Sequence, residues 1–157
     1  MANPFSESKT FHKIGHITNT IPLRVMPTPR GIAVITTTGR KTGKARVRAV
    51  RAVRDDDQVY AVALLGKKTA WLANARANPI VQIKLGTKTF HAAAREVTDP
   101  EERARAARLY RPVVGWYDYV DYANFVWGIP TRSRLLAAHD RWFDAGVVVA
   151  FDLGDEA

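Results

Sequence analysis

The segment from Gly31 to Arg54 constrains the fold of this chain more than any other, because it reads as two strands joined by a tight turn. Residues 32–38 are apolar and β-branched, which is typical of a buried strand. Gly39 and Gly43 bracket the turn, where the backbone bends sharply or takes a positive φ. The turn and the second strand together contain seven basic residues and no acidic one: Arg40, Lys41, Lys44, Arg46, Arg48, Arg51 and Arg54.

This basic turn predicts a site for a phosphate or another anion. Backbone N–H groups left open by the glycines, together with cationic side chains, suit a negatively charged group. The alternative interpretation is a solvated face that keeps the protein soluble, since charge runs often do no more than that. The formal net charge of +9 and the pI near 10.2 favour an anionic partner, whether nucleic acid, anionic lipid or a multiply charged small molecule.

The rest of the pattern predicts an α+β domain, mainly β, built from antiparallel strands. Apolar runs bounded by turn residues predict further strands at residues 59–65, 80–85, 88–97 and 146–153. Helices are expected at residues 70–76, 100–110 and 133–143, and the acidic tail at 155–157 is expected to fray. Strands joined mostly by hairpins favour an antiparallel sheet or barrel over a parallel sheet. We expect an N-terminal extension at residues 1–30 and a single domain at residues 31–157.

The amino-acid composition and spacing exclude several kinds of functional site. The chain contains no cysteine, which excludes disulfides, thiol nucleophiles and thiolate metal sites. His12 and His16 are four residues apart, but no carboxylate or further histidine lies close by, so no metal site is expected. No apolar run reaches the ~20 residues that span a bilayer, and no secretory signal opens the sequence. A cytoplasmic location is expected, with Phe11, Ile14 and Ile17 as candidates for peripheral contact with the inner face of the membrane.

Aromatic residues provide a second candidate site. No standard catalytic signature is present, so difficult chemistry would fall to a cofactor. Trp116, Tyr119 and Tyr122 recur at i, i+3 and i+6 and share one helical face, which suits a lid over a flat ring; they could equally pack the helix against the barrel. Trp71 and Asn74 form a similar pair at i, i+3. The pattern alone favours a place in the core for Trp71 over contact with a ligand.

Several motifs together resemble one family. ITTTGRKTGKARV at residues 35–47 is followed by Ala70-Trp71, by Asn74 and by RANP at residues 76–79. This combination resembles the deazaflavin-dependent nitroreductases, the reductases of actinobacteria that use coenzyme F-420 on a split β-barrel. The resemblance implies a small-molecule acceptor and hydride transfer from the reduced coenzyme to an electron-poor quinone, enone or activated nitro compound. It covers residues 31–122 and the last strand.

The resemblance also implies roles for particular residues. The motif that holds the coenzyme's phosphate matches the turn residues Arg40, Lys41, Thr42 and Gly43 and the strand residue Arg46. Candidates for the coenzyme's anionic glutamate tail are Lys44, Arg48, Lys67 and Lys68. Trp71 and Asn74 match residues beside the coenzyme. The aromatic substrate lip corresponds to Trp116, Tyr119 and Tyr122, with Tyr119 or Tyr122 as the catalytic proton donor.

Three departures from the family pattern bear on the acceptor pocket. The segment at residues 63–69 is short and lacks serine, Ala49 stands where proline is common, and a helical insertion is expected near residues 125–145. Two alternative functions also stay open. A split-barrel relative could bind FMN or haem, because an anion cradle does not by itself distinguish the FMN phosphate from that of F-420. A basic nucleic-acid-binding module would account for the net charge but not for the glycine-bounded turn, so no nucleic acid is expected.

Overall fold

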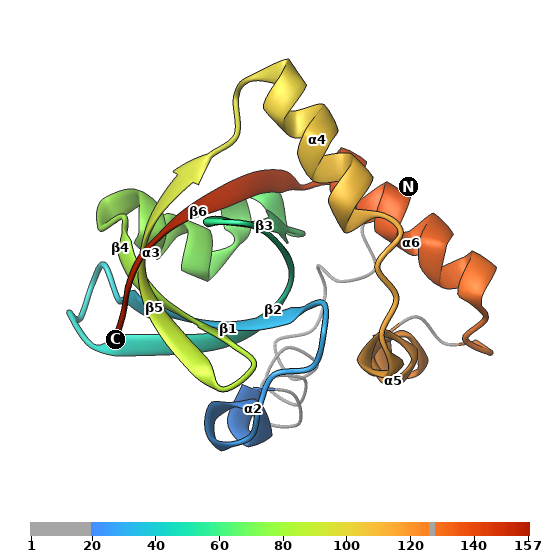
Figure 1. Ribbon diagram of the computed structural model, residues 1–157, viewed down its shortest axis with the longest axis horizontal. Helices are drawn as coiled ribbons and strands as arrows, with labels where there is room; N and C mark the ends of the chain where they lie inside the picture. The colour runs from blue at the N-terminus through green and yellow to red at the C-terminus, as the bar shows by residue number, and fades with distance from the viewer. Residues whose placement is uncertain (1–19, 126–127) are drawn as a thin grey trace.

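Six antiparallel strands close into a barrel in the order β1-β2-β3-β6-β5-β4, with β4 pairing back onto β1 (Figure 1). The structure is a computed structural model and describes residues 20–125 and 128–157, apart from the side chains of residues 67, 121, 124 and 125. Residues 1–19, with the predicted membrane contacts Phe11, Ile14 and Ile17 and the pair His12 and His16, lie outside the described residues. The strands are β1 (Ile32–Thr38), β2 (Ala45–Asp55), β3 (Gln58–Ala63), β4 (Ile80–Leu85), β5 (Lys88–Glu96) and β6 (Val147–Glu156).

Helices flank this barrel. They are α2 (Ile21–Val25), α3 (Ala70–Ala77), α4 (Pro100–Tyr110), α5 (Trp116–Phe125) and α6 (Arg132–Ala145), and a short 3₁₀ helix at Gly66–Lys68 precedes α3. The predicted fold class, an antiparallel split-type barrel with flanking helices, is confirmed. In the described part of the chain, no helix has the length and apolar character needed to cross a bilayer.

The barrel interior is filled by small, branched and aromatic side chains and is closed at one end by α3. Trp71, Leu72 and Ala75 of α3 pack with the same interior cluster as Ile35 and Phe151. Since side chains alternate along a strand, even-numbered residues of β2 such as Ala52 face inward and odd-numbered residues such as Val53 face outward. The inward-facing side chains of β2 thus pack in the same cluster as α3, whereas its outward-facing side chains pack against other helices.

Helices α4 and α6 cover the outward face of β2, β3 and β6 (Figure 1). Helix α4 begins as predicted, because the Asp99 carboxylate accepts a hydrogen bond from the Glu102 N–H at 2.8 Å and proline occupies the first turn. Arg95 of β5 then fixes this end of the helix, since its guanidinium contacts Glu102 at 2.7 Å and Asp152 of β6 at 2.9 Å. We call Arg95, Glu102 and Asp152 the α4 clamp.

The prediction that the acidic tail frays is wrong. Strand β6 continues to Glu156, which pairs with Phe90, and the Ala157 N–H donates to the Thr89 carbonyl oxygen at 2.8 Å. Glu156 also forms an ion pair with Lys88 at 2.9 Å. The tail is therefore ordered by a neighbouring strand that supplies both backbone partners and an opposite charge.

Candidate functional site

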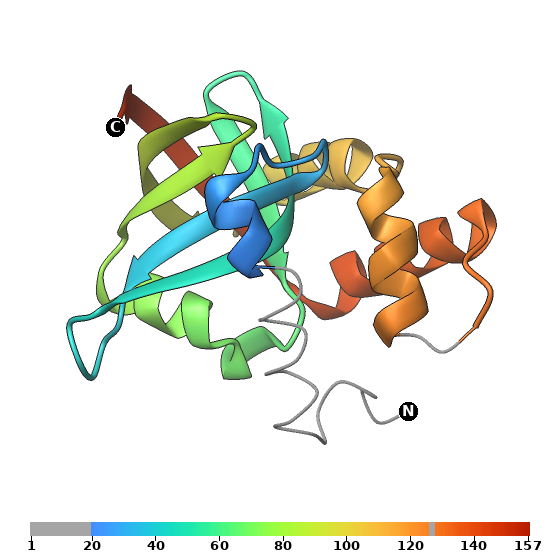
Figure 2. The same ribbon diagram turned by 90° about the horizontal axis from the view of Figure 1, so that it is seen from below.

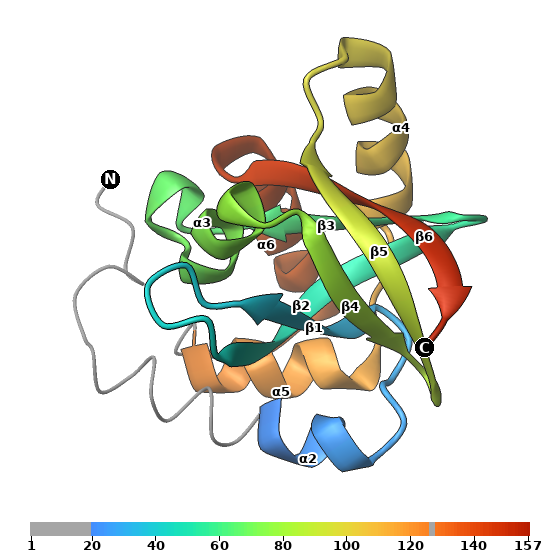
Figure 3. The same ribbon diagram turned by 90° about the vertical axis from the view of Figure 1, so that its left-hand side faces the viewer.

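A cavity of about 340 Å³ is lined by residues of the β1–β2 turn and of helix α3. Figure 3 shows these two elements at the same end of the barrel. The cavity is lined by Gly39, Arg40, Lys41, Thr42, Arg46, Arg48, Ala70, Trp71 and Asn74. Its size lies within the range of small-molecule and cofactor sites. The structure therefore brings together seven of the residues predicted to contact the coenzyme, although 25 or more residues separate the turn from α3 in the sequence.

The turn that forms one wall is held by its own backbone. The Gly39 N–H donates to the Lys44 carbonyl oxygen at 2.8 Å, and the Thr42 and Gly43 N–H groups donate to the Gly39 carbonyl oxygen at 3.2 and 2.7 Å. Gly43 has a φ of 65°, which favours glycine. A Cβ on Gly39 would lie 3.0 Å from the Lys44 carbonyl oxygen and the Thr42 hydroxyl oxygen, so a larger residue would distort the turn.

These hydrogen bonds correct one expectation about the anion site. Open backbone N–H groups were expected in the turn, but those of Thr42 and Gly43 are bonded within it and that of Arg40 donates to Asn74. The expectation is wrong at these three positions, because the turn satisfies two of the donors itself and Asn74 of α3 satisfies the third. Contact with an anion falls instead to the side chains.

Asn74 joins the turn to α3. Its side-chain oxygen accepts hydrogen bonds from the backbone N–H of Arg40 at 3.2 Å and from the Arg40 guanidinium at 3.3 Å. Its amide nitrogen donates to the Thr37 hydroxyl oxygen at 3.1 Å. The residue is buried, so these contacts are shielded from water and fix the orientation of Arg40 at the cavity.

The cavity concentrates positive charge without compensating acids. Arg46 and Arg48 occupy even positions of β2 and so face the cavity, beside Arg40 and Lys41 of the turn. Burial lowers the pKa of the half-buried Arg48 guanidinium, which nevertheless stays charged at neutral pH. In the described part of the chain, none of these four cations pairs with a carboxylate. This donor set fits a multiply anionic group such as the predicted coenzyme's phosphate and tail.

Trp71 belongs to both the core and the cavity, so the two interpretations of its position are compatible. Its side chain is buried, and its ring lies 6.1 Å from that of Phe151 in the barrel interior. It also forms part of the cavity wall beside Asn74. Packing on Phe151 fixes the indole, which gives a ligand a rigid apolar surface.

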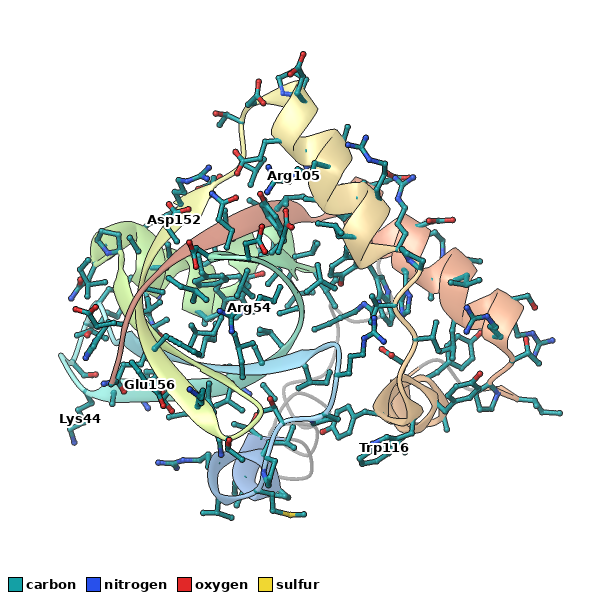
Figure 4. The ribbon with its side chains drawn as sticks, viewed as in Figure 1. Lys44, Arg54, Arg105, Trp116, Asp152 and Glu156 are labelled. Carbon is teal, nitrogen blue, oxygen red and sulfur yellow. The ribbon has the colours of Figure 1, made fainter. Side chains whose placement is uncertain are left out.

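Other predicted coenzyme contacts do not line the cavity. Gly43 and Lys44 belong to the turn, and Figure 4 shows Lys44 projecting away from the barrel. Lys68 is exposed beside the start of α3, and the side chain of Lys67 lies outside the described residues. Their predicted role in binding an anionic tail stays a prediction.

The predicted aromatic lip lies on α5 and is not part of the cavity wall. Trp116 is 66% exposed and projects outward, as Figure 4 shows, while Tyr119 is partly exposed. Tyr122 is only 7% exposed, because it packs against Leu135 and Ala138 of α6. Tyr119 packs against the same cluster but is less buried, so it is the more accessible of the two candidate proton donors.

A buried ionic group on the other side of β2 was not predicted. Arg51 pairs with Asp118 of α5 at 2.6 Å, and His139 of α6 lies 3.5 Å from the same carboxylate. Burial alone would raise the pKa of Asp118, but contact with His139, the charge of Arg51 and the Gly115 N–H together hold it below its usual range. Alternation along β2 was the available signal, because Arg51 is odd-numbered whereas Arg46 and Arg48 are even-numbered.

Comparison with known proteins identifies the family. Residues 11–132 match the sequence profile described as F420H(2)-dependent quinone reductase. An F420H(2)-dependent quinone reductase of Mycobacterium tuberculosis strain H37Rv is 37% identical over 82 residues, which cover 49% of this chain and 52% of the relative. The chain thus matches about half the length of its curated relatives.

Solved structures agree on the fold. That of an F420-H2 dependent reductase, FDR-A, has a TM-score of 0.51 and 23% identity, covering 83% of this chain and 99% of its own. The heme storage protein HutZ of Vibrio cholerae has a TM-score of 0.51 and 13% identity, covering 80% and 83%. At these identities the likeness concerns architecture alone. The sequence profile, in contrast, covers most of the chain and confirms the family inferred from the motifs: this chain belongs to the F420H(2)-dependent quinone reductases.

Proposed function

We propose that this protein is an F-420-dependent reductase that reduces a small electron-poor acceptor. A quinone is the first candidate for this acceptor, ahead of an enone or an activated nitro compound. The observation that carries the proposal is the cavity beside α3, which is lined by four cations together with a tryptophan and an asparagine. Within the described residues, none of the four cations pairs with a carboxylate. Such a donor set suits a coenzyme with a phosphate and an anionic tail better than a singly charged ligand.

Each side of the cavity has a proposed task. Arg40, Lys41 and Arg46 bind the phosphate, assisted by the Thr42 hydroxyl, and Arg48 binds part of the anionic tail. Asn74 keeps Arg40 in place. When bound, the reduced coenzyme supplies the hydride, so the protein needs only to orient the acceptor and exclude water.

The acceptor is proposed to bind beside α5. Trp116 and Tyr119 are the exposed and partly exposed members of the predicted lip. The Tyr119 hydroxyl is proposed to donate a proton to the oxygen of the reduced acceptor. Tyr122 is proposed to support Tyr119 through packing on α6, since its side chain is buried there.

Figures 1 and 2 show α2 and α5 on the same side of the barrel. Peripheral membrane contact is proposed through a surface made of the exposed apolar residues of this side, which are Ile21, Val25, Met26, Trp116 and Val120. Arg24 of α2 is exposed beside them and would favour anionic lipid. Sedimentation with anionic vesicles tests this contact, and Val25→Asp should reduce the bound fraction. Equal sedimentation of both proteins would exclude this surface as the membrane contact.

Binding titrations test the proposed coenzyme. Quenching of tryptophan fluorescence by F-420 should saturate, whereas FMN should bind at least tenfold more weakly, a difference of about 1.4 kcal/mol. Lys41→Ala should weaken F-420 binding about tenfold relative to the wild type, which corresponds to about 1.4 kcal/mol of binding free energy. Lys88→Ala, in the β4–β5 hairpin, is the matched control and should bind as the wild type does.

Activity assays then test the reaction. Reduced F-420 and a soluble naphthoquinone should be consumed in equal amounts, and Tyr119→Phe should lower kcat by at least tenfold if its proton is used. Binding of FMN alone would instead favour the flavin relative. Binding of neither coenzyme, with salt-sensitive binding of DNA or RNA, would favour the nucleic-acid alternative.

A further inference from the structure

Helix α5 is attached to the barrel by a charged group as well as by apolar packing. Tyr117 packs against Leu23, Ile32 and Val34, while the adjacent Asp118 pairs with Arg51 at 2.6 Å. Both charged side chains are more than nine-tenths buried. Because a buried ion pair depends on close geometry, this contact fixes the position of α5 more narrowly than apolar packing does.

Asp118 also organises the first turn of α5. Its second carboxylate oxygen accepts a hydrogen bond from the Gly115 N–H at 2.7 Å, while its own N–H donates to the Gly115 carbonyl oxygen at 3.2 Å. The first bond is the half of a capping box in which the N3 side chain reaches back to the N-cap N–H, and the second is a backbone turn, because Gly115 has no side chain. One carboxylate therefore begins the helix and also connects it to β2.

Arg51 binds the chain on both sides of the loop that leads into α5. Its guanidinium donates to the Tyr110 carbonyl oxygen at 2.8 Å and to that of Val113, and it lies 4.7 Å from the centre of the Tyr110 ring. Arg51 shares β2 with the cavity residues Arg46 and Arg48 but faces the opposite side. A single strand thus presents the coenzyme cations and holds the helix that carries the predicted lip.

His139 completes the group from α6. The side chain is fully buried, and its Nδ1 lies 3.1 Å from the Arg111 carbonyl oxygen. Since a carbonyl oxygen only accepts, Nδ1 carries a proton, and Nε2 is directed at Asp118 at 3.5 Å. Within the described residues, Nε2 has no hydrogen-bond partner. The imidazole therefore contacts the end of α4 through Nδ1 and lies beside Asp118 at the start of α5.

We propose that Arg51, Asp118 and His139 are positioning residues that hold α5 where Trp116 and Tyr119 can meet the acceptor. The positioning role of the three residues rests on the proposed function, because it assumes that the lip binds the acceptor. The attachment of α5 to the barrel does not depend on that function. None of the three residues lines the coenzyme cavity. Breaking the group should therefore raise KM for the acceptor and leave coenzyme binding unchanged.

The first test compares Asp118→Asn with the wild type. Asparagine has nearly the same shape but carries no charge, so amide hydrogens of α5 should exchange about tenfold faster. KM for the naphthoquinone should rise about tenfold, because displaced binding groups orient the acceptor poorly. The Kd for F-420, from the same fluorescence titration, should change less than about twofold. Arg51→Lys, which keeps the charge but not the fork of donors, should show intermediate effects.

Arg95→Met is the matched control. This substitution removes both ion pairs of Arg95 in the α4 clamp, so amide hydrogens of α4 should exchange faster. Exchange in α5 and KM for the acceptor should stay at wild-type values. If Arg95→Met raised KM as Asp118→Asn does, the effect would reflect general loss of stability and the positioning role would be overturned.

The outcomes separate this proposal from the proposed function. Unchanged α5 exchange in Asp118→Asn would overturn the attachment whatever the activity. Faster α5 exchange with unchanged KM would overturn the positioning role while leaving the reductase intact. A wild type without F-420 activity would overturn the proposed function and the role of the lip, yet α5 exchange would still test the attachment.

A second variant serves if Asp118→Asn does not fold. His139→Asn keeps a hydrogen-bond donor for the Arg111 carbonyl oxygen and should produce the same changes at smaller amplitude.

Discussion

Arg48 illustrates the cost of a binding site at the scale of one residue. Its guanidinium is half-buried, and within the described chain no carboxylate compensates its charge. Burying a cation without a partner is unfavourable, so Arg48 lowers the stability of the free protein, whereas it strengthens the binding of an anion. The residue therefore has opposite effects on stability and on binding.

Arg48→Met separates the two effects. The unbranched apolar side chain of methionine replaces the aliphatic stem of the arginine without its charge, so the free protein should melt at the same temperature or about 2–4 °C higher. This is the shift that about 1 kcal/mol produces in a chain of this size. F-420 should bind about tenfold more weakly. Arg54→Met, at the other end of the same strand and face, is the control and should leave coenzyme binding unchanged. A lower melting temperature for Arg48→Met would contradict this account.

Asn74 has the opposite balance, because its contacts support both stability and binding. Asn74→Ala leaves Arg40 and Thr37 without the side-chain partner they share, which should cost about 1–3 kcal/mol of unfolding free energy. Chemical denaturation measures this loss. Coenzyme binding should weaken as well, since the Arg40 guanidinium is no longer held in place. Full-strength binding in this variant would show that the turn keeps its shape unaided.

The sequence identified the residues of the cavity better than those of the α5 attachment. Gly39 and Gly43 with their basic neighbours form a local motif, and a turn brings such residues together whatever the rest of the fold does. Arg51, Asp118 and His139 meet only through three elements that are distant in the sequence. Predicting that contact requires the packing of α5 and α6, which local spacing does not contain.

Element boundaries show a similar division. The start of α4 was predicted correctly because the Asp99 cap and the following proline act within one turn. The fraying predicted for residues 155–157 was wrong because composition says nothing of the strand beside them. The helical insertion near residues 125–145 stays a prediction, and α6 provides most of the corresponding segment.

The α4 clamp predicts a pH dependence of stability. Hydrogen bonds from Arg95 lower the pKa of Glu102 and of Asp152 below their ordinary values. A carboxyl group with a lowered pKa in the folded state stabilises the protein above its unfolded pKa of about 4 and loses this effect as the pH falls through the folded value.

Arg95→Met should therefore cost the most near neutral pH. Partly exposed pairs contribute at most about 1 kcal/mol, so the melting temperature should fall by about 2–4 °C at pH 7. The difference from the wild type should shrink as the pH is lowered from about 5 to about 2. Thermal melts monitored by circular dichroism measure both values. A difference that persists at the acid end would mean that the methionine disturbs packing and not charge.

Closure of the barrel depends on its last strand at the scale of the whole molecule. Strand β6 pairs with β3 on one side and β5 on the other, so both lose a partner if it is absent. Deleting residues 147–157 should abolish cooperative unfolding, because the interior cluster loses Val149 and Phe151 and two sheet edges are left open.

Deleting only residues 155–157 is the matched comparison. It removes the Lys88 ion pair and the last backbone contact with β5, so the barrel should still unfold cooperatively, with about 1–2 kcal/mol less stability. Denaturant titrations of the two shortened proteins measure both effects. A cooperative transition in the longer deletion would show that five strands suffice.

The place of β6 in the barrel has a consequence for biosynthesis. A ribosome makes β3 early, at residues 58–63, but the strand that must lie beside it emerges only after residue 146. Until then β3 and β5 present unpaired edges, and contacts so distant along the chain form slowly. Newly made chains should therefore be most prone to aggregation, and most dependent on chaperones, during the interval between the synthesis of α4 and the release of β6.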